Sequence, residues 1–371
     1  MNCATVKPQV KRDANLDLLR IVSMLLIIFL HTIDHTGVME KAETASNAMY
    51  FYVRFTYAAT QVCVNCYVML SGYYLVKSNF SIKKLAKLWM EAVFYTLVFK
   101  FIFICMGRET LSVVMLGSCF FPILTGRYWF LTIYAGLYLV SPFLNLFVSA
   151  MDKKMHTCLN ICLFGLFSLW NSFHPAIAGM NSGGGWGLAW FVVLYLCAAW
   201  FRLYYTPDEK PLGKLPAFLL IPALIAAAQL VARMTGIGIL QTVATHWFRY
   251  ESAPVYVMTL SLFAFFLNIR ISNEKVGRMI CAIAPLTFGV YLIHTHPDVS
   301  PWLWEVTALP RFMDSMWFPV IQIGCVLMVF AVCAVMDELR KRTVGKLENH
   351  RSIDMLCKKI TNIYLRAADK M

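Results

Sequence analysis

The first long apolar segment limits what this chain can fold into. Residues 15–35 read NLDLLRIVSMLLIIFLHTIDH, in which ten uncharged residues separate Arg20 from His31. At about 1.5 Å per helical residue, the two residues would stand roughly 16 Å apart, and eleven positions are close to three turns. Both side chains would therefore lie near one face of a helix. Ionisable side chains are costly inside a bilayer and usually face a bundle interior or a cavity, so the segment predicts a transmembrane helix with one functional face.

The composition places the rest of the chain in lipid as well. Of 371 residues, 59% are hydrophobic and only 14% are charged, whereas soluble proteins carry about 25% charged residues. The segment 15–35 is too long for the apolar part of a signal peptide and lacks a small-residue cleavage site, so we expect it to be retained. The twelve cysteines are scattered through apolar stretches. This pattern indicates packing residues and predicts no disulfide framework, metal site or redox site.

Apolar stretches long enough to cross a bilayer recur ten times along the chain. We place them at 16–36, 50–76, 88–106, 128–148, 157–173, 188–204, 216–231, 255–269, 280–294 and 317–336. Between them we expect an interfacial loop at 108–126, a glycine-rich turn at 174–187 and a loop at 297–315 whose two tryptophans suit the membrane interface. The predicted fold is an all-α polytopic bundle of about ten transmembrane helices over residues 1–338. A charged amphipathic tail at 339–371 would follow.

The distribution of charge predicts the orientation. The formal net charge is +13, and with these spans 25 of the 33 Lys and Arg residues fall on one side and 7 on the other, while Lys100 lies within a span. The positive-inside rule then places both termini in the cytoplasm. It also accounts for the basic balance better than nucleic-acid binding does, and we expect no nucleic-acid partner. Arg20 would stand at the cytoplasmic edge, and His31 would lie in the outer half of the membrane.

Polar residues gather toward that outer half. They are His31, Asp34 and His35 after the first span, Arg127, Tyr128 and Trp129 before the fourth, Trp247, Arg249 and Glu251 before the eighth, and His294 and His296 after the ninth. An imidazole takes and gives a proton near neutral pH, and an arginine holds an anion without losing its charge. The set suits acyl transfer to a hydroxyl, with a histidine as base and a cation or hydrogen-bond donor for the oxyanion.

Simpler explanations exist for single members of this set. Tyr128 and Trp129 taken alone are typical of aromatic anchors at the interface. Arg20 fits a topology charge, and so do the lysines at 83, 84 and 87, which could instead receive an anionic cytoplasmic donor. A lone histidine at a helix end is commonly an interfacial side chain. The residues alone therefore predict a polytopic protein with a polar intramembrane site.

Five segments extend this prediction through a resemblance. They are LDLLRIVSMLLIIFLH at 16–31, VNCYVMLSGYYL at 64–75, GRYWFLTIYAGLYLVSPFL at 126–144, WFVVLYLCAAWFR at 190–202 and FGVYLIHTHP at 288–297. In this order they resemble the motifs of the acyltransferase-3 family, the membrane O-acyltransferases of bacterial surface glycans. The signature of that family is Arg or Lys, ten residues, then His, which here falls on Arg20 and His31.

The resemblance implies a multi-pass protein of the bacterial cytoplasmic membrane that takes an acyl group, usually acetyl, from cytoplasmic acyl-CoA. The acceptor would be a sugar hydroxyl on a lipid-linked or surface glycan, and acyl-CoA would be a substrate with no bound cofactor. It implies that His31 is catalytic with Arg20 as its partner. The acceptor side would hold Tyr128, Trp129, Arg127, His294 and Glu251, and the CoA would meet Lys83, Lys84 and Lys87. The family often has an R-x-x-R pattern where this chain has Lys84 and Lys87, and lysine loses the bidentate contact to phosphate.

Two points stay open at the level of sequence. His31 could deprotonate the acceptor hydroxyl or carry the acyl group transiently. A transporter or flippase of a glycan or lipid precursor would also combine many spans with a polar midplane. Transporters usually show internal repeats or broken helices in matching halves, and the sequence shows neither.

Overall fold

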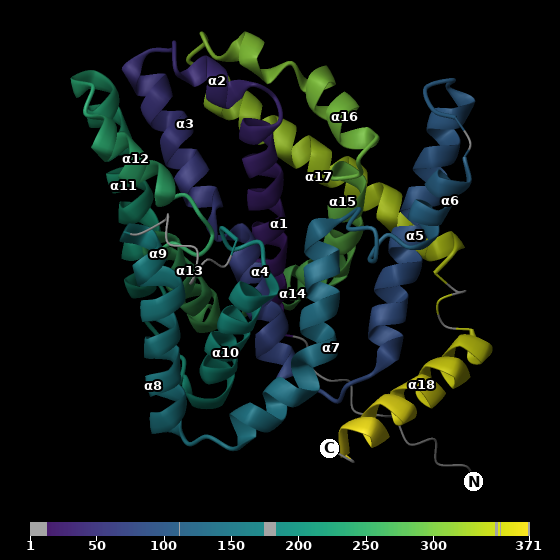
Figure 1. Ribbon diagram of the computed structural model, residues 1–371. Helices are drawn as coiled ribbons and strands as arrows, with labels where there is room; N and C mark the ends of the chain where they lie inside the picture. The colour runs from purple at the N-terminus through teal and green to yellow at the C-terminus, as the bar shows by residue number, and fades with distance from the viewer. Residues whose placement is uncertain (1–12, 111, 174–182, 346–347, 349, 370–371) are drawn as a thin grey trace.

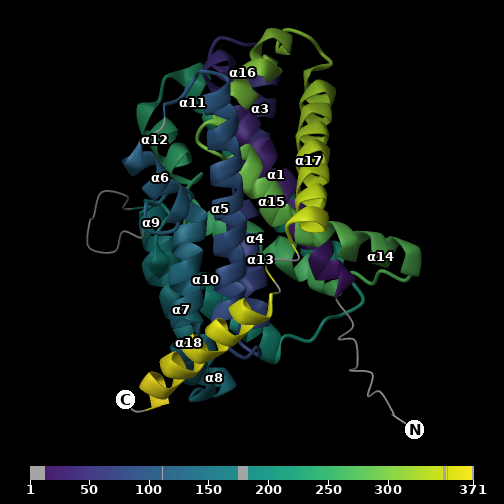
Figure 2. The same ribbon diagram turned by 90° about the vertical axis from the view of Figure 1, so that its right-hand side faces the viewer.

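The computed structural model describes the chain except for residues 1–12, 111, 174–182, 346–347, 349 and 370–371. The described part contains helices and no strand, arranged as a bundle (Figures 1 and 2). Six segments are long and apolar enough to cross a membrane: α1 (Ala14–Asp34), α5 (Ile82–Cys105), α7 (Trp129–Ser149), Leu212–Thr235 with α11 (Pro216–Thr235), Glu274–His294 and α17 (Phe318–Thr343). Two shorter apolar helices are α10 (Leu188–Tyr204) and α13 (Ala253–Asn268).

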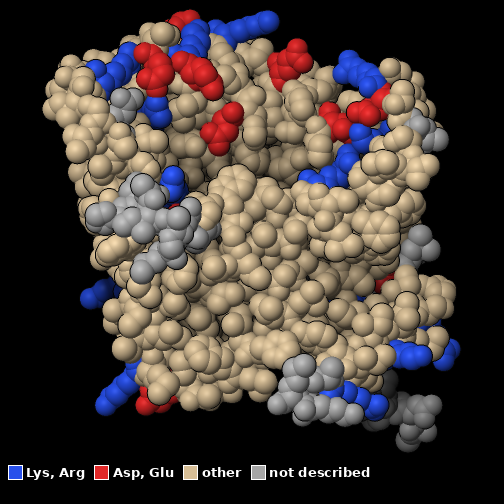
Figure 3. Space-filling view, viewed as in Figure 1, with Lys and Arg blue, Asp and Glu red and all other residues tan. Residues whose placement is uncertain are grey.

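The surface has the charge pattern of a multi-pass membrane protein. Figure 3 shows Lys, Arg, Asp and Glu gathered toward the two ends of the bundle, with a mostly uncharged band between them. A band of mostly uncharged side chains can face lipid, and the helices beneath it satisfy their own backbone hydrogen bonds, as a bilayer requires. Helix α1 begins at the end of the bundle where α18 (Arg351–Asp369), the last described helix, lies (Figure 1). The prediction of which end faces the cytoplasm comes from the count of Lys and Arg residues on each side.

Three of the predicted spans are interrupted, so the structure does not confirm ten continuous spans. The second is α3 (Asn47–Thr60) and α4 (Val62–Leu75), separated at Gln61. The fifth is α8 (Lys153–Leu163), a π-helical stretch (Phe164–Leu169) and α9 (Trp170–Phe173). The ninth is α14 (Glu274–Ile283) and α15 (Thr287–His294), joined by the 3₁₀ turn Ala284–Leu286. That turn contains Pro285, which cannot donate a helical hydrogen bond, and α14 extends away from the bundle (Figure 2).

The connecting segments are more helical than the sequence predicted. The expected loops contain α2 (Val38–Ala42), α6 (Val113–Phe120), α12 (Gly238–His246) and α16 (Val299–Thr307). The predicted start of the third span at 88 is wrong, because α5 begins at Ile82 and includes Lys83, Lys84 and Lys87 in its first turns. Helix α17 likewise continues past residue 338 to Thr343. Of the predicted glycine-rich turn, 174–182 lies outside the described residues.

Helix α1 is the central element of the bundle. It packs against α3, α4, α13, α14, α15 and α17. A polar contact holds its C-terminal half: Nε2 of Gln322 in α17 donates to Oγ1 of Thr32 at 2.8 Å, and the Tyr52 hydroxyl of α3 donates to Oε1 of Gln322 at 3.0 Å. Because Thr32 and Gln322 are buried away from water, the bond between them fixes the rotation of α1 against α17.

Two glycines allow close approach between helices around α1. A Cβ on Gly72 of α4 would lie 3.0 Å from the Cα of Tyr195 in α10. A Cβ on Gly289 of α15 would lie 2.6 Å from the Cβ of Asp337 in α17. Asp337 is buried and accepts hydrogen bonds from the Tyr95 hydroxyl at 2.9 Å and from Nε of Arg340 at 2.8 Å. The side chain therefore has no free space into which it could move.

We expect Gly289→Ala to destabilise the protein by about 1–3 kcal/mol, the usual cost of an overpacked interior. The measurement is thermal unfolding of the purified protein in detergent. Gly324→Ala in α17 is the matched control, because a Cβ there meets nothing within 4 Å and alanine favours a helix. Equal melting temperatures for the two variants would contradict the close contact of α15 with Asp337.

Candidate functional site

One face of α1 lines two cavities. The His31 cavity, about 480 Å³, is bordered by Met24, Ile27, His31 and Asp34 of this helix. The Arg20 cavity, about 210 Å³, lies toward the start of α1 and is bordered by Arg20. These five positions recur every three or four residues, which is the spacing of one helical face. The face predicted from the sequence therefore lines internal space along most of the helix.

The two cavities adjoin at a neck of aromatic side chains. Tyr67 of α4, Phe130 of α7 and Phe288 of α15 line both cavities. They come from three helices that surround the middle of α1. The two cavities follow one another along α1 from Arg20 toward His31, and these three side chains lie between them.

His31 is surrounded by other rings at the end of α1. Its ring centroid lies 4.9 Å from that of His35, 5.2 Å from that of His294 and 6.2 Å from that of Trp304. The Nδ1 atom of His31 is buried and has no hydrogen-bond partner among the described residues. A buried nitrogen without a partner is costly. It is therefore a candidate for a bond to a substrate that enters the cavity.

His294, the last residue of α15, and His296, two residues later, have opposite tautomers, as assigned from their hydrogen bonds. Nδ1 of His294 lies 2.6 Å from the Val290 carbonyl oxygen, so it carries the proton and leaves Nε2 as an acceptor. Nδ1 of His296 accepts the backbone N–H of Asp298 at 3.2 Å, so its proton sits on Nε2. Burial, together with the positive charges of Arg127 and Lys100, lowers the pKa of His296 to about 3. His296 is therefore a neutral side chain beside the ion network described next.

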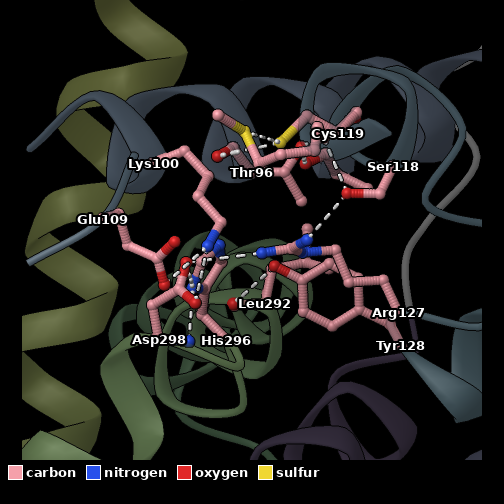
Figure 4. A network of polar contacts seen from close by, with 12 residues as sticks. Thr96, Lys100, Glu109, Ser118, Cys119, Arg127, Tyr128, Leu292, His296 and Asp298 are labelled. Carbon is pink, nitrogen blue, oxygen red and sulfur yellow. Dashed lines mark hydrogen bonds and ion pairs between the residues drawn. The ribbon is translucent and has the colours of Figure 1, made fainter. Parts of the chain in front are cut away.

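A network of buried and half-buried ions holds Arg127 at the His31 cavity (Figure 4). Asp298 accepts from Lys100 Nζ at 3.0 Å and pairs with Nη2 of Arg127 at 3.4 Å. Glu109 lies 3.2 Å from the same Lys100 nitrogen, and Nη1 of Arg127 donates to Oγ of Ser118 at 3.1 Å. Two cations thus face two carboxylates, and their charges balance. The Nε of Arg127 is buried without a partner among the described residues.

Aromatic residues close the other side of the cavity. The ring of Trp129 lies 4.3 Å from that of Trp186, which is 51% exposed and lies 5.8 Å from the ring of Tyr250. Gly185 has a φ of +89°, and a Cβ there would lie 2.5 Å from the Cβ of Tyr250, so only glycine fits this turn. Nδ2 of Asn65 donates to the Tyr250 carbonyl at 2.7 Å and fixes its backbone.

A third cavity, which we call the outer cavity, adjoins the His31 cavity. Its volume is about 560 Å³, and it shares Asp34, Trp186 and Tyr250 with the His31 cavity. Arg54 and Arg249 also line it. The outer cavity therefore combines aromatic faces with charged and hydrogen-bonding groups directly beside the His31 cavity.

The structure brings most of the predicted acceptor-side residues together. Arg127, Tyr128 and Trp129 line the His31 cavity, and His294 lies against His31. The Tyr128 hydroxyl donates to the Leu292 carbonyl at 3.2 Å, which ties the start of α7 to α15. Glu251 is buried and is not among the described residues that line these cavities.

The predicted donor-side residues lie toward the Arg20 cavity. Arg20 contacts Asp17, with 3.2 Å between Nη1 and Oδ1. Lys83 pairs with Asp354 of α18, and Nζ of Lys84 lies 3.4 Å from Oγ of Ser78. Leu88, one turn after Lys84, lines the Arg20 cavity. The three lysines are thus close in sequence to the cavity wall, although Lys83 and Lys84 already have partners.

Several residues of the site were missed by the sequence analysis, among them Asp298, Trp304 and Tyr67. Trp304, predicted to sit at the membrane interface, is only 1% exposed and packs its edge against His31. Its Nε1 donates to Oγ of Ser300 at 3.0 Å, one helical turn away, and Ser300 lines the cavity. The prediction was wrong because α16 folds back over the end of α1. Tyr67 could have been found, since its turn-by-turn spacing from Cys63 and Ser71 repeats the pattern of α1.

We expect Asp298→Asn to destabilise the protein by about 3 kcal/mol, because it leaves Lys100 and Arg127 as buried cations with one carboxylate. Thermal unfolding in detergent measures this effect. The control is Glu338→Gln, which removes an exposed i,i+4 pair with Arg342 and should change little. If Asp298→Asn and Glu338→Gln had the same melting temperature, the idea that Asp298 stabilises these two cations would be contradicted.

Comparison with known proteins agrees with the geometry. The family model described as an acyltransferase domain, that of the acyltransferase-3 family, matches residues 13–337. No curated protein and no solved structure matches the chain. The match covers α1 with its Arg20–His31 face and every helix that lines the three cavities. This multi-pass membrane protein belongs to the acyltransferase-3 family.

Proposed function

We propose that the protein transfers an acyl group, in the first instance acetyl, from cytoplasmic acyl-CoA to a sugar hydroxyl of a cell-surface or lipid-linked glycan. The membrane would be the bacterial cytoplasmic membrane, with both termini inside. One observation carries the proposal: the single face of α1 that bears Arg20 and His31 lines two adjoining cavities. An acyl group needs such a route if its donor and acceptor are on opposite sides of a bilayer.

The donor would bind at the end of the bundle where α1 and α5 begin. Its phosphates need cations, and Lys83, Lys84 and Lys87 supply them in the first turns of α5. The head group would displace the contacts of Lys83 with Asp354 and of Lys84 with Ser78. The pantetheine arm would pass Arg20 and the aromatic neck. The helical rise between Arg20 and His31, about 16 Å, is of the order of the length of that arm.

The transfer chemistry would take place at His31. As general base, His31 takes the proton of the acceptor hydroxyl, whose oxygen attacks the thioester carbonyl carbon. The C–S bond breaks, and the CoA sulfur leaves with the proton from His31. As acyl carrier, a His31 nitrogen attacks the carbonyl carbon first, the C–S bond breaks, and the CoA sulfur leaves with the proton of the imidazole. The acceptor hydroxyl then attacks the acyl group, the bond to the His31 nitrogen breaks, and the hydroxyl proton returns to that nitrogen. Arg127 faces the same cavity and would stabilise the oxyanion in either route.

The acceptor would enter through the outer cavity. Trp186 and Tyr250 border both this cavity and the His31 cavity and present aromatic faces to a sugar ring. Arg54, Arg249 and Asp34 add hydrogen-bonding groups beside them. Sites for small polar ligands combine aromatic walls with few, well-placed polar groups. This arrangement supports a sugar acceptor without naming the sugar.

We expect His31→Gln to lower acyl transfer by about 10²–10⁴-fold, the usual contribution of a general acid–base group. Membrane vesicles with the variant would be incubated with radiolabelled acetyl-CoA, and label in the glycan would be counted. His246→Gln is the control, because His246 is bonded to its own helix at Thr242 and does not line these cavities. Wild-type labelling by His31→Gln would refute the assignment of His31.

The same assay distinguishes the alternatives. Label that stays on the protein when no acceptor is present, and is lost in His31→Gln, identifies His31 as an acyl carrier. Label found only in the glycan identifies it as a base. A transporter or flippase would move glycan across vesicles without incorporating acetyl, and that result would overturn the proposal as a whole.

A further inference from the structure

Helix α18 has three distinct faces, and only one of them contacts the protein. Successive residues of a helix are about 100° apart, so its side chains divide into three sectors. The protein face holds Ile353, Asp354, Cys357, Thr361, Tyr364 and Leu365, which are buried or half-buried. The apolar face holds Leu356, Ile360 and Ile363, and the basic face holds Arg351, Lys358, Lys359 and Arg366. All seven residues of these last two faces are exposed.

The protein face fixes α18 to the first turn of α5 and to the middle of α7. The Tyr364 hydroxyl donates to the Leu139 carbonyl of α7 at 2.6 Å, and Oγ1 of Thr361 accepts the backbone N–H of Ile82 in α5 at 3.0 Å. Asp354 pairs with Lys83. Figure 2 shows α18 lying obliquely across the lower parts of α5 and α7. The position of α18 is therefore set by bonds to defined atoms.

The apolar face continues a surface that is expected to meet lipid. Leu356 is 59% exposed and Ile363 is 60% exposed. Beside α18, the spanning helix α7 exposes Phe143 and Leu146, and the Phe143 ring lies 6.3 Å from the ring of Tyr364. Side chains of a spanning helix that face outward at this level contact hydrocarbon. Ile360 and Ile363 occupy the sector of α18 next to Tyr364, so we expect the apolar face to adjoin this surface of α7.

The basic face indicates which lipids α18 would contact at that surface. Its four cations stand on a different sector from the apolar face, which is the arrangement of a helix lying in a membrane interface. We propose that α18 is an interfacial helix that inserts Leu356, Ile360 and Ile363 among the acyl chains. Its cations then bind the anionic headgroups of phospholipids in that leaflet. Because Thr361 and Asp354 hold the first turn of α5, lipid binding also fixes the position of Ile82 and Lys83.

The test is hydrogen–deuterium exchange of the full-length protein in lipid nanodiscs. One set contains phosphatidylcholine alone, and the other contains phosphatidylcholine mixed with phosphatidylglycerol. Amides of residues 353–366 should exchange about tenfold or more slowly in the anionic set, because each cation near an anionic surface contributes roughly fivefold to the binding equilibrium. The difference should shrink at high salt, which screens these charges.

Three variants test whether the charges and apolar side chains of α18 cause the slower exchange. The charge reversal K358E/K359E/R366E should abolish the difference between the lipids, and the charge-conserving control K358R/K359R/R366K should keep it. The apolar substitution I360S/I363S should speed exchange of α18 in both lipids, while the amides of α10 stay protected as evidence of an intact fold. Equal exchange in the two lipids, or slowing that persists in K358E/K359E/R366E, would overturn the proposal. Protection that appears only when a disc holds two copies would assign the apolar face to a second copy instead.

Discussion

The architecture depends on keeping one polar face of α1 away from lipid. Arg20, His31 and Asp34 lie on that face within a helix whose other side chains are mostly apolar. An ionisable group exposed to hydrocarbon is costly, so the face must be enclosed by protein. The surrounding helices enclose it and leave cavities along it, while the Gln322–Thr32 bond fixes the rotation of the helix. The cost of the polar face is thus offset by the packing that forms the site.

Interrupted helices complete the site around α1. Helix α15 has only eight residues, about 12 Å at helical rise, and it ends at His294 beside His31. The α3–α4 break at Gln61 likewise lies on the wall of the outer cavity. Backbone groups freed by such breaks are tolerated at membrane depth only where protein or a cavity surrounds them. Gly289 lets α15 approach Asp337 closely enough to hold this short helix in place.

Much of the fold followed from local sequence pattern. The predicted helix at 188–204 is α10 with the same ends, and the predicted first span differs from α1 by two residues at each end. These predictions succeeded because apolar length and helical periodicity are properties of short segments. The interruptions at Gln61 and at Ala284–Leu286 were missed. Pro285 was the one local sign of the second break, whereas no proline or glycine marks the break at Gln61.

The site, like the fold, has features that local sequence predicted and features that it did not. Spacing along the chain predicted that Arg20 and His31 share one face. The order of residues predicted that Arg127, Tyr128 and Trp129 lie at the end of a spanning helix. Neither predicted the ring of Trp304 over His31, the Asp298 partner of Arg127 or the contacts of α18 with α5.

The sequence by itself therefore determined that this is a multi-pass membrane protein, which family it belongs to, and that Arg20 and His31 share one face of α1. Only the tertiary structure decided which residues enclose that face, which side chains lie between the cavities and which lysines already have partners. The physical reason is the range of the interactions. Helix periodicity and hydrophobic length act within one segment, whereas burial, ion pairing and cavity shape depend on side chains that folding brings together from distant segments.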